Sequence, residues 1–341
     1  MSGWLPIEIV LGRYPSLVWP GVVPETTVRW MQFGCKRLNE PFFSQSVAQL
    51  RESDHPALEI ETDVTSLVRE GSRTPRLLPN GFIFHVSRCG STLISNALKL
   101  VDRIQVVAEA RPITRLFMPC PPVEGDAFID PGQDEERRKL TECLFSLFSC
   151  YRTGKPEPIV VKFMSQNSIS FSTIHGLWPD VPCLFVIRDP VDVMVSNLKD
   201  GGLNRFTESP ALAYAMCGAD PSLPISQISV EEFCARVLGR YFDALIGKVG
   251  PNVRIIDYDD INPESICDII KFFHLDPSAD LACMDSVFQR YSKDPTGNTP
   301  FHGDRLEKRE GASARIRNAA NLWALPRYSK LRFASGRGQV V

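Results

Sequence analysis

Five consecutive residues, Arg88-Cys89-Gly90-Ser91-Thr92, have the types and spacing of an anion-binding turn. The apolar run that precedes them predicts a buried strand, and the serine and threonine after the glycine begin a helix. The first backbone N–H groups of a helix have no helical partner, and the helix dipole favours negative charge there. Arg88 adds a permanent positive charge to the turn. The segment therefore predicts a cradle for phosphate or a similar anion.

This cradle differs from the P-loop motif of ATPases. His85 stands where that motif requires its first glycine, and Ser91 stands where it requires lysine. The difference argues against an ordinary P-loop kinase. Cys89 is small enough for the turn, and its place at a helix N-terminus predicts a lowered thiol pKa.

A second charged turn follows a later apolar run. The segment Val186-Ile-Arg-Asp-Pro-Val-Asp-Val-Met-Val-Ser196 predicts a strand end, with Asp189 as helix N-cap and Pro190 in the first helical turn. Arg188 is expected to point into the same crevice as the Gly90 turn. Ser196 lies two helical turns further and could offer a hydroxyl. Two such turns predict a ligand with two separated anionic groups.

The elements that must position these turns alternate along the chain. Short apolar runs predict five strands, at Phe82–Ser87, Ile104–Ala108, Ile159–Phe163, Cys183–Ile187 and Val253–Tyr258. Helices are expected between them at about 91–100, 134–152, 190–199 and 229–248. This order predicts a three-layer α/β sandwich with a central, mostly parallel sheet and helices on both faces. Ligands of such sheets bind at the carboxyl ends of the strands.

Residues 1–78 differ from the rest and predict an N-terminal extension packed on a main domain formed by residues 79–341. The extension is rich in Trp and Pro near its start, and a helix is expected at Ser44–Arg51. The segment Gly71-Ser-Arg-Thr-Pro-Arg76 is interpreted as a linker. Nothing in this extension indicates a function.

Composition excludes several classes of protein. The 341 residues carry a net charge of −2 with a pI of about 6.3, which does not favour a nucleic-acid partner. No apolar run reaches the ~18 residues that would span a bilayer, and the N-terminus lacks the features of a signal peptide. The ten cysteines form neither a CxxC pair nor a zinc-like cluster. We therefore expect a cytoplasmic protein with reduced thiols and no metal.

Together the two turns resemble the motifs of sulfotransferases that use 3′-phosphoadenosine 5′-phosphosulfate (PAPS). Residues 88–92 are similar to the family's first motif, a basic residue followed by small-Gly-Ser/Thr-Ser/Thr. Residues 188–196 are similar to its second, Arg-Asn/Asp-Pro-x-Asp-x-x-x-Ser. Each motif alone is weak, but their order and their separation of about 100 residues make the pair specific. The resemblance covers about residues 80–335 and implies the P-loop-like fold.

The resemblance also implies roles for individual residues. The 88–92 loop would bind the 5′-phosphosulfate, and Arg188 and Ser196 would hold the 3′-phosphate. Glu109 and Arg111 look like the Glu-x-Arg of the bacterial and tyrosylprotein branch, in which the Glu is the general base on the acceptor. Lys162 resembles a lysine that stabilises the leaving phosphate. Other branches use a histidine base, and His175, interpreted as a turn residue, is the nearest alternative here.

The resemblance implies sulfuryl transfer from PAPS to a hydroxyl or amine of a small-molecule or peptide acceptor, leaving adenosine 3′,5′-bisphosphate (PAP), without a metal. The loop at 299–309 is similar to one that closes over the nucleotide in relatives, but the Arg-Lys-Gly motif of the cytosolic members is missing. The alternatives are a non-catalytic nucleotide-binding module and, less favoured, a P-loop kinase. The acceptor and the oligomeric state stay open.

Overall fold

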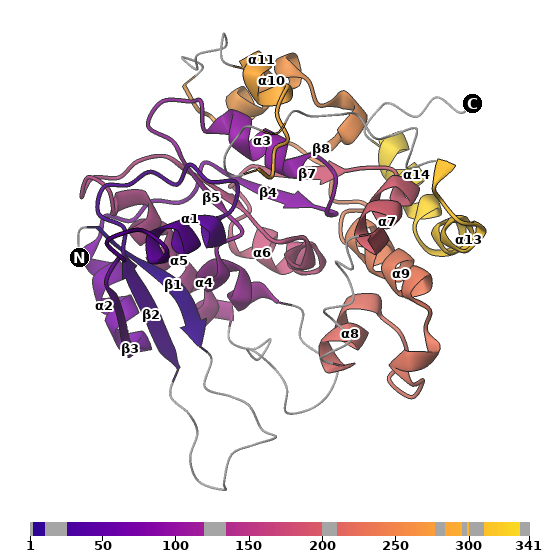
Figure 1. Cartoon of the computed structure of the whole chain (residues 1–341), viewed down its shortest axis with the longest axis horizontal. Coiled ribbons are helices and arrows are strands. Elements are labelled where there is room, and N and C mark those ends of the chain that lie inside the picture. Colours follow the sequence, from indigo (N-terminus) through magenta and orange to yellow (C-terminus); the bar gives the residue numbers. More distant parts are fainter. Residues whose placement is uncertain are drawn as a thin grey trace, which may run out of the picture.

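A computed structural model describes residues 3–10, 26–118, 134–199, 210–276, 284–294, 299 and 310–334. Its centre is a five-stranded parallel sheet with the strand order β5-β6-β4-β7-β8 (Figure 1). The strands are β4 (Gly81–His85), β5 (Gln105–Ala108), β6 (Ile159–Lys162), β7 (Cys183–Ile187) and β8 (Val253–Asp257). The predicted fold class is confirmed, and each predicted strand is present within one or two residues at each end.

Helices cover both faces of this sheet. The helices that the sequence predicts are α1 (Phe43–Arg51), α3 (Ser91–Leu98), α5 (Asp134–Cys150), α7 (Pro190–Lys199) and α9 (Val230–Asp243). The described residues form further helices that it did not predict or bound: α2 (Val64–Arg73), α4 (Arg111–Thr114), α6 (Phe171–Leu177), α8 (Pro210–Cys217), α10 (Pro263–Phe272), α11 (Met284–Phe288), α13 (Ala314–Trp323) and α14 (Leu325–Ala334).

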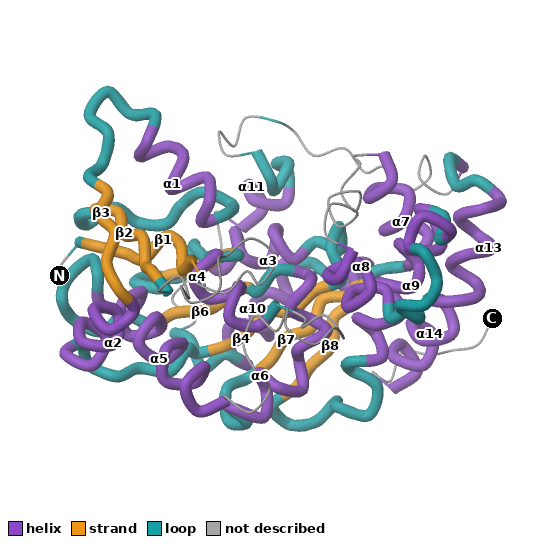
Figure 2. Tube along the Cα trace, turned by 90° about the horizontal axis from the view of Figure 1, so that it is seen from below, coloured by secondary structure: helices purple, strands orange, loops and turns teal. Residues whose placement is uncertain are grey.

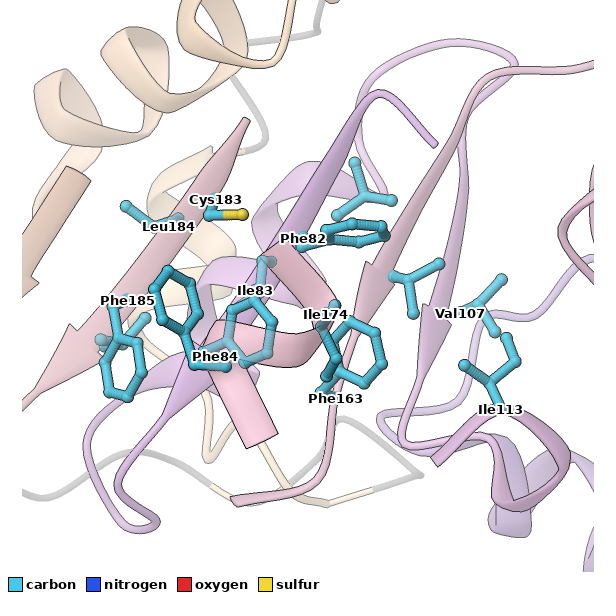
Figure 3. Packing of buried hydrophobic residues seen from close by; sticks show 14 of the residues in the cluster. Phe82, Ile83, Phe84, Val107, Ile113, Phe163, Ile174, Cys183, Leu184 and Phe185 are labelled. Carbon is cyan, nitrogen blue, oxygen red and sulfur yellow. The ribbon is translucent and has the colours of Figure 1, made fainter. Parts of the chain in front are cut away.

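Aromatic side chains fill one face of the central sheet. Phe84 of β4 stacks on Phe163 with ring centroids 4.9 Å apart and on Phe185 of β7 at 6.0 Å (Figure 3). Phe82, two residues earlier on the same face, packs against Phe145 of α5 and Trp178 beyond α6. Every residue of β4, β5, β6 and β7 is buried, whereas β8 is partly exposed. Burial on both faces explains the continuous apolar runs of these four strands.

The N-terminal segment contains a second sheet that the sequence analysis missed. Strands β1 (Trp4–Val10), β2 (Thr27–Gln32) and β3 (Glu59–Asp63) pair antiparallel in that order. This sheet lies at one side of the molecule, opposite α13 and α14 (Figures 1 and 2). Its buried side chains belong to the same hydrophobic cluster as the central strands. The boundary between an extension and a main domain at residues 78 and 79 stays a prediction.

The interpretation of residues 71–76 as a linker was wrong for its first half. Residues 71–73 form the last turn of α2, and this helix packs along α5. Gly71 is needed there because a Cβ atom would overlap the Cβ of Cys143. Gly71 therefore reflects the close packing of α2 on α5 and does not mark a loop.

Candidate active site

A cavity of about 720 Å³ opens at the carboxyl edge of the central sheet. In spatial order, β5 ends before Glu109, β6 ends in Lys162, β4 leads to Arg88, and β7 leads to Arg188. Parallel strands present their carboxyl ends at one edge, so residues far apart in sequence meet there. Tyr258, directly after β8, completes the row. The cavity is lined by the predicted residues Arg88, Cys89, Gly90, Ser91, Thr92, Glu109, Arg188 and Ser196.

The loop between β4 and α3 has an unusual backbone. Ser87, Arg88 and Gly90 have φ angles of 69°, 50° and 83°, all in the left-handed region. A run of such conformations turns successive N–H groups toward one side and favours an anion. Gly90 is required twice over, because a Cβ atom would also lie 2.7 Å from Cδ1 of Ile261. Strained backbone in a pocket is typical of binding sites.

Arg188 connects the two charged turns. Its Nη1 lies 3.3 Å from the carbonyl oxygen of Arg88, and its Nη2 donates to Oδ2 of Asp192 at 3.1 Å. The guanidinium also lies over the ring of Tyr258, with 4.0 Å between its Cζ and the centroid. The predicted N-cap is confirmed, because Val191 N–H donates to Asp189 at 2.8 Å. Arg188 is therefore both part of a buried ion pair and part of the pocket wall.

Glu109 and Lys162 form a close pair across neighbouring strand ends. The Lys162 Nζ donates to Oε1 of Glu109 at 2.7 Å and to Oγ1 of Thr92 at 3.2 Å. Lys162 has no exposed surface and is not part of the cavity lining, so it lies behind the other two. Burial raises the pKa of Glu109, but the charge of Lys162 and the contact with His85 outweigh burial and lower it to about 2.

His85 also lines the cavity, although the sequence analysis noted it only as a departure from the P-loop motif. It is 5% exposed, and Ser87 N–H donates to its Nδ1 at 3.1 Å. Its Nε2 lies 3.1 Å from the carbonyl oxygen of Phe163 and 3.4 Å from Oε1 of Glu109. Burial lowers the pKa of His85. Its place beside the motif was the available signal.

Further cations that the sequence analysis did not single out reach the cavity. Lys199, at the end of α7, and Arg290 and Lys293, after α11, all line it. Burial, together with the charges of Arg88 and Lys162, lowers the pKa of Lys293 to about 8. The segment carrying Lys293 is tied to α3 by Asn96, which donates to the carbonyl of Ser292 at 2.8 Å. Because α11 follows the central strands by many residues, only the fold reveals that Arg290 and Lys293 reach the cavity.

An aromatic side chain from the N-terminal segment completes the wall beside Glu109. Phe42 lines the cavity, and its ring centroid lies 4.9 Å from the Nζ of Lys162. Arg37 and Lys99 hold this segment in place, because Arg37 donates to the carbonyls of Lys99, Val101 and Ile104. Lys99 Nζ donates in turn to the carbonyls of Asn39 and Glu40. The N-terminal segment is therefore part of the site.

Two residues singled out by sequence lie away from the cavity. Arg111 is outside its lining, with a largely exposed side chain whose Nη1 lies 3.8 Å from Glu8 of β1. His175 lies within helix α6, not in a turn, and packs edge-on against Phe171. The expected low thiol pKa of Cys89 was also wrong, because complete burial raises it. The predicted nucleotide-closing loop lies, from residue 300 to residue 309, outside the described residues.

Among the described residues, no three His, Cys, Asp or Glu side chains gather as a metal site would require. Within the same part of the chain, no helix is long and apolar enough to cross a membrane.

Two groups of polar and cationic residues face the cavity. Arg88 and the strained loop offer a positive charge and backbone N–H groups, and Arg188 and Ser196 form the second group. The two groups are adjacent, as the contact between Arg188 and the Arg88 carbonyl shows. The fold and the cavity thus define an α/β protein with a cationic cavity at the carboxyl edge of its parallel sheet.

The chain is similar to solved sulfotransferase structures. The enzyme from Alicyclobacillus acidocaldarius is 16% identical, with a TM-score of 0.40, over 77% of this chain and 98% of that one. STF9 from Mycobacterium avium is 12% identical, with a TM-score of 0.43, over 76% and 81%. Mouse SULT7A1, complexed with PAP, is 13% identical, with a TM-score of 0.35, over 80% and 92%. Values this low transfer no activity to this chain. No protein-family model and no curated protein matches it.

Proposed function

We propose that the protein is a sulfotransferase that transfers a sulfuryl group from PAPS to a hydroxyl or amine of its acceptor. One observation carries this proposal: a single cavity joins a two-ended cationic cradle to a carboxylate that is held ionised. Arg88 and Arg188 represent the cradle, and Glu109 is the carboxylate. A nucleotide-binding module without catalysis has no need of the second feature.

The two ends of the cradle divide the donor between them. In the proposal, the 88–92 loop takes the 5′ end with its N–H groups and with Arg88. Arg188 and Ser196 take the 3′-phosphate, and the stacking of Arg188 on Tyr258 fixes the plane of its guanidinium. The ion pair with Asp192 keeps the same side chain from turning away.

When bound, such a donor supplies an activated sulfuryl group, whose transfer builds negative charge on the leaving oxygen. Arg88 and Lys293 line the cavity and can balance this charge. Lys162 adds positive charge from behind Thr92, at the start of α3.

Glu109 receives the proton of the acceptor in this proposal. Its Oε1 is bound by Lys162, so Oε2 is the oxygen left for an acceptor hydroxyl. The lowered pKa of Glu109 keeps the carboxylate ionised at neutral pH. In a loose transition state the acceptor keeps its proton until late, and the ionised carboxylate is ready to accept it. Phe42 shields the pair on the side of the N-terminal segment.

The test is calorimetry of the wild-type chain with PAP, AMP and ATP, followed by an assay for sulfuryl transfer from PAPS. We expect PAP to bind at least ~10-fold more tightly than AMP, because a charge-assisted hydrogen bond contributes about 1.5–3 kcal/mol. Equal affinities would contradict the assignment of Arg188 to the 3′-phosphate. ATP binding that requires Mg²⁺ and ends in hydrolysis would favour the kinase alternative.

A further inference from the structure

His85 is a buried, uncharged histidine that lies between the two functional parts of the cavity. It is the last residue of β4, so it lies just before the loop that contains Gly90. The residue is 5% exposed, yet it lines the cavity. Such a residue could merely fill space, so its hydrogen bonds decide what it does.

The hydrogen bonds fix which ring nitrogen carries the proton. Ser87 N–H can only donate, so the Nδ1 that lies 3.1 Å from it must accept and is unprotonated. The proton of the neutral ring is then on Nε2. This atom faces two acceptors, the carbonyl oxygen of Phe163 at 3.1 Å and Oε1 of Glu109 at 3.4 Å. One tautomer satisfies all three contacts.

Each end of the ring therefore touches a different part of the proposed machinery. Nδ1 holds the N–H of Ser87, whose φ of 69° begins the strained loop that receives the donor. Nε2 supports the same oxygen of Glu109 that Lys162 binds at 2.7 Å. With Oε1 contacted by both groups, the carboxylate cannot rotate without losing a bond, and Oε2 stays directed to the acceptor.

We propose that His85 is a positioning residue that couples the donor loop to the base: its Nδ1 holds the loop at Ser87, and its Nε2–H orients Glu109. This inference rests on the proposed function for its meaning, but its geometry does not. The ring itself takes up no proton in the reaction, because its Nδ1 is already occupied.

The charged or titratable groups that face Glu109 come from three parts of the fold. Lys162 lies at the end of β6, His85 at the end of β4, and Lys293 on the segment after α11. Lys162 and Lys293 bring charge, whereas neutral His85 brings a polar contact between its Nε2 and Oε1 at 3.4 Å. Removing His85 is therefore expected to change the orientation of the carboxylate more than its ionisation.

Two substitutions separate the two ends of the ring. The Oδ1 of asparagine can take the place of Nδ1, and the Nε2 of glutamine can take the place of the histidine Nε2. We expect H85N to keep PAP affinity within about twofold and to lose about 10-fold or more in kcat, because the contacts of Nε2 with Glu109 and with the Phe163 carbonyl are lost while the Nδ1 contact is kept. We expect H85Q to keep most of kcat while PAP affinity falls by about threefold or more.

The result that overturns the inference is equal loss of kcat in H85N and H85Q, or a pattern in which their effects are exchanged. Histidine ¹⁵N spectra of the wild-type chain give a measurement that is independent of activity. We expect the neutral ring of His85 to be protonated on Nε2, with its pKa lowered by burial. A ring protonated on Nδ1 overturns the inference even if no transfer occurs. Absence of transfer by the wild-type chain contradicts the proposed function alone.

Discussion

The two sides of the cavity balance their charges in opposite ways. On the base side, Glu109 is contacted by Lys162 and His85, and these neighbours stabilise its ionised form. On the cradle side, Lys293 is surrounded by Arg88 and Lys162, and burial with these cations disfavours its charged form. The base side is therefore complete in itself, whereas the cradle side gains stability when an anion enters. This difference indicates that a ligand should bind on the cradle side and that the reaction should occur on the base side.

The largest effect is expected on the base side. Glu109→Gln should lower the rate of sulfuryl transfer by about 10²- to 10⁴-fold, because the proton acceptor is removed. PAP affinity measured by calorimetry should change by less than about threefold, since the cradle is intact. Glu8→Gln, which removes a carboxylate paired with Arg111 outside the cavity, is the matched control and should leave transfer unchanged. Transfer that survives E109Q at the wild-type rate would remove Glu109 from the mechanism.

On the cradle side, Arg188 is tested with and without a change to its ion-pair partner Asp192. Arg188→Ala alone should lower the free energy of unfolding by about 3–5 kcal/mol, because it breaks a buried ion pair. The double variant R188M/D192N should recover most of this stability in urea unfolding. Its PAP affinity should still be about 10- to 100-fold weaker, with AMP affinity unchanged. A double variant that binds PAP normally would place the 3′-phosphate elsewhere.

The shape of the cradle is tested at Gly90. Gly90→Ala should destabilise the fold by about 1–3 kcal/mol and weaken PAP binding, because the new Cβ meets Ile261 and a φ of 83° strains alanine. Gly176→Ala is the matched control in α6, where nothing lies within 4 Å of the added atom. This control should be neutral or gain up to about 1 kcal/mol. Equal thermal unfolding of the two variants would show that the loop relaxes easily.

The smallest effect, and the sharpest test of the difference between the two sides, concerns pH. Lys293 binds an anion best when protonated, and its pKa is about 8, so wild-type PAP affinity should fall as pH rises above that value. The fall should end above the raised pKa that Lys293 acquires in the complex. Lys293→Met should bind PAP up to about 10-fold more weakly at neutral pH and should lose this alkaline decrease. A decrease that persists in K293M would assign it to another group.

Much of the central fold could be predicted, because four of its five strands are fully buried and show as short apolar runs. Phe82 to Phe84 is such a run, and the left-handed turn at Gly90 has a glycine where one is required. The N-terminal sheet could not be predicted in the same way. Strand β3 is exposed along most of its length and reads Glu-Ile-Glu-Thr-Asp, which has no apolar pattern. Tertiary pairing with β2 overrides its weak local preference.

The sequence by itself determined the chemistry of the strand ends: the cradle at Arg88 and the second turn at Arg188 follow from local patterns, and the candidates Glu109 and Lys162 follow from the resemblance that these two turns carry. Only the tertiary structure decided how these groups are paired. It placed Lys162 behind Glu109, gave His85 a fixed tautomer, and brought Phe42 and Lys293 to the cavity from opposite ends of the chain. The physical reason is that hydrogen bonds, burial and charge depend on neighbours in space, and most of these neighbours are distant in sequence.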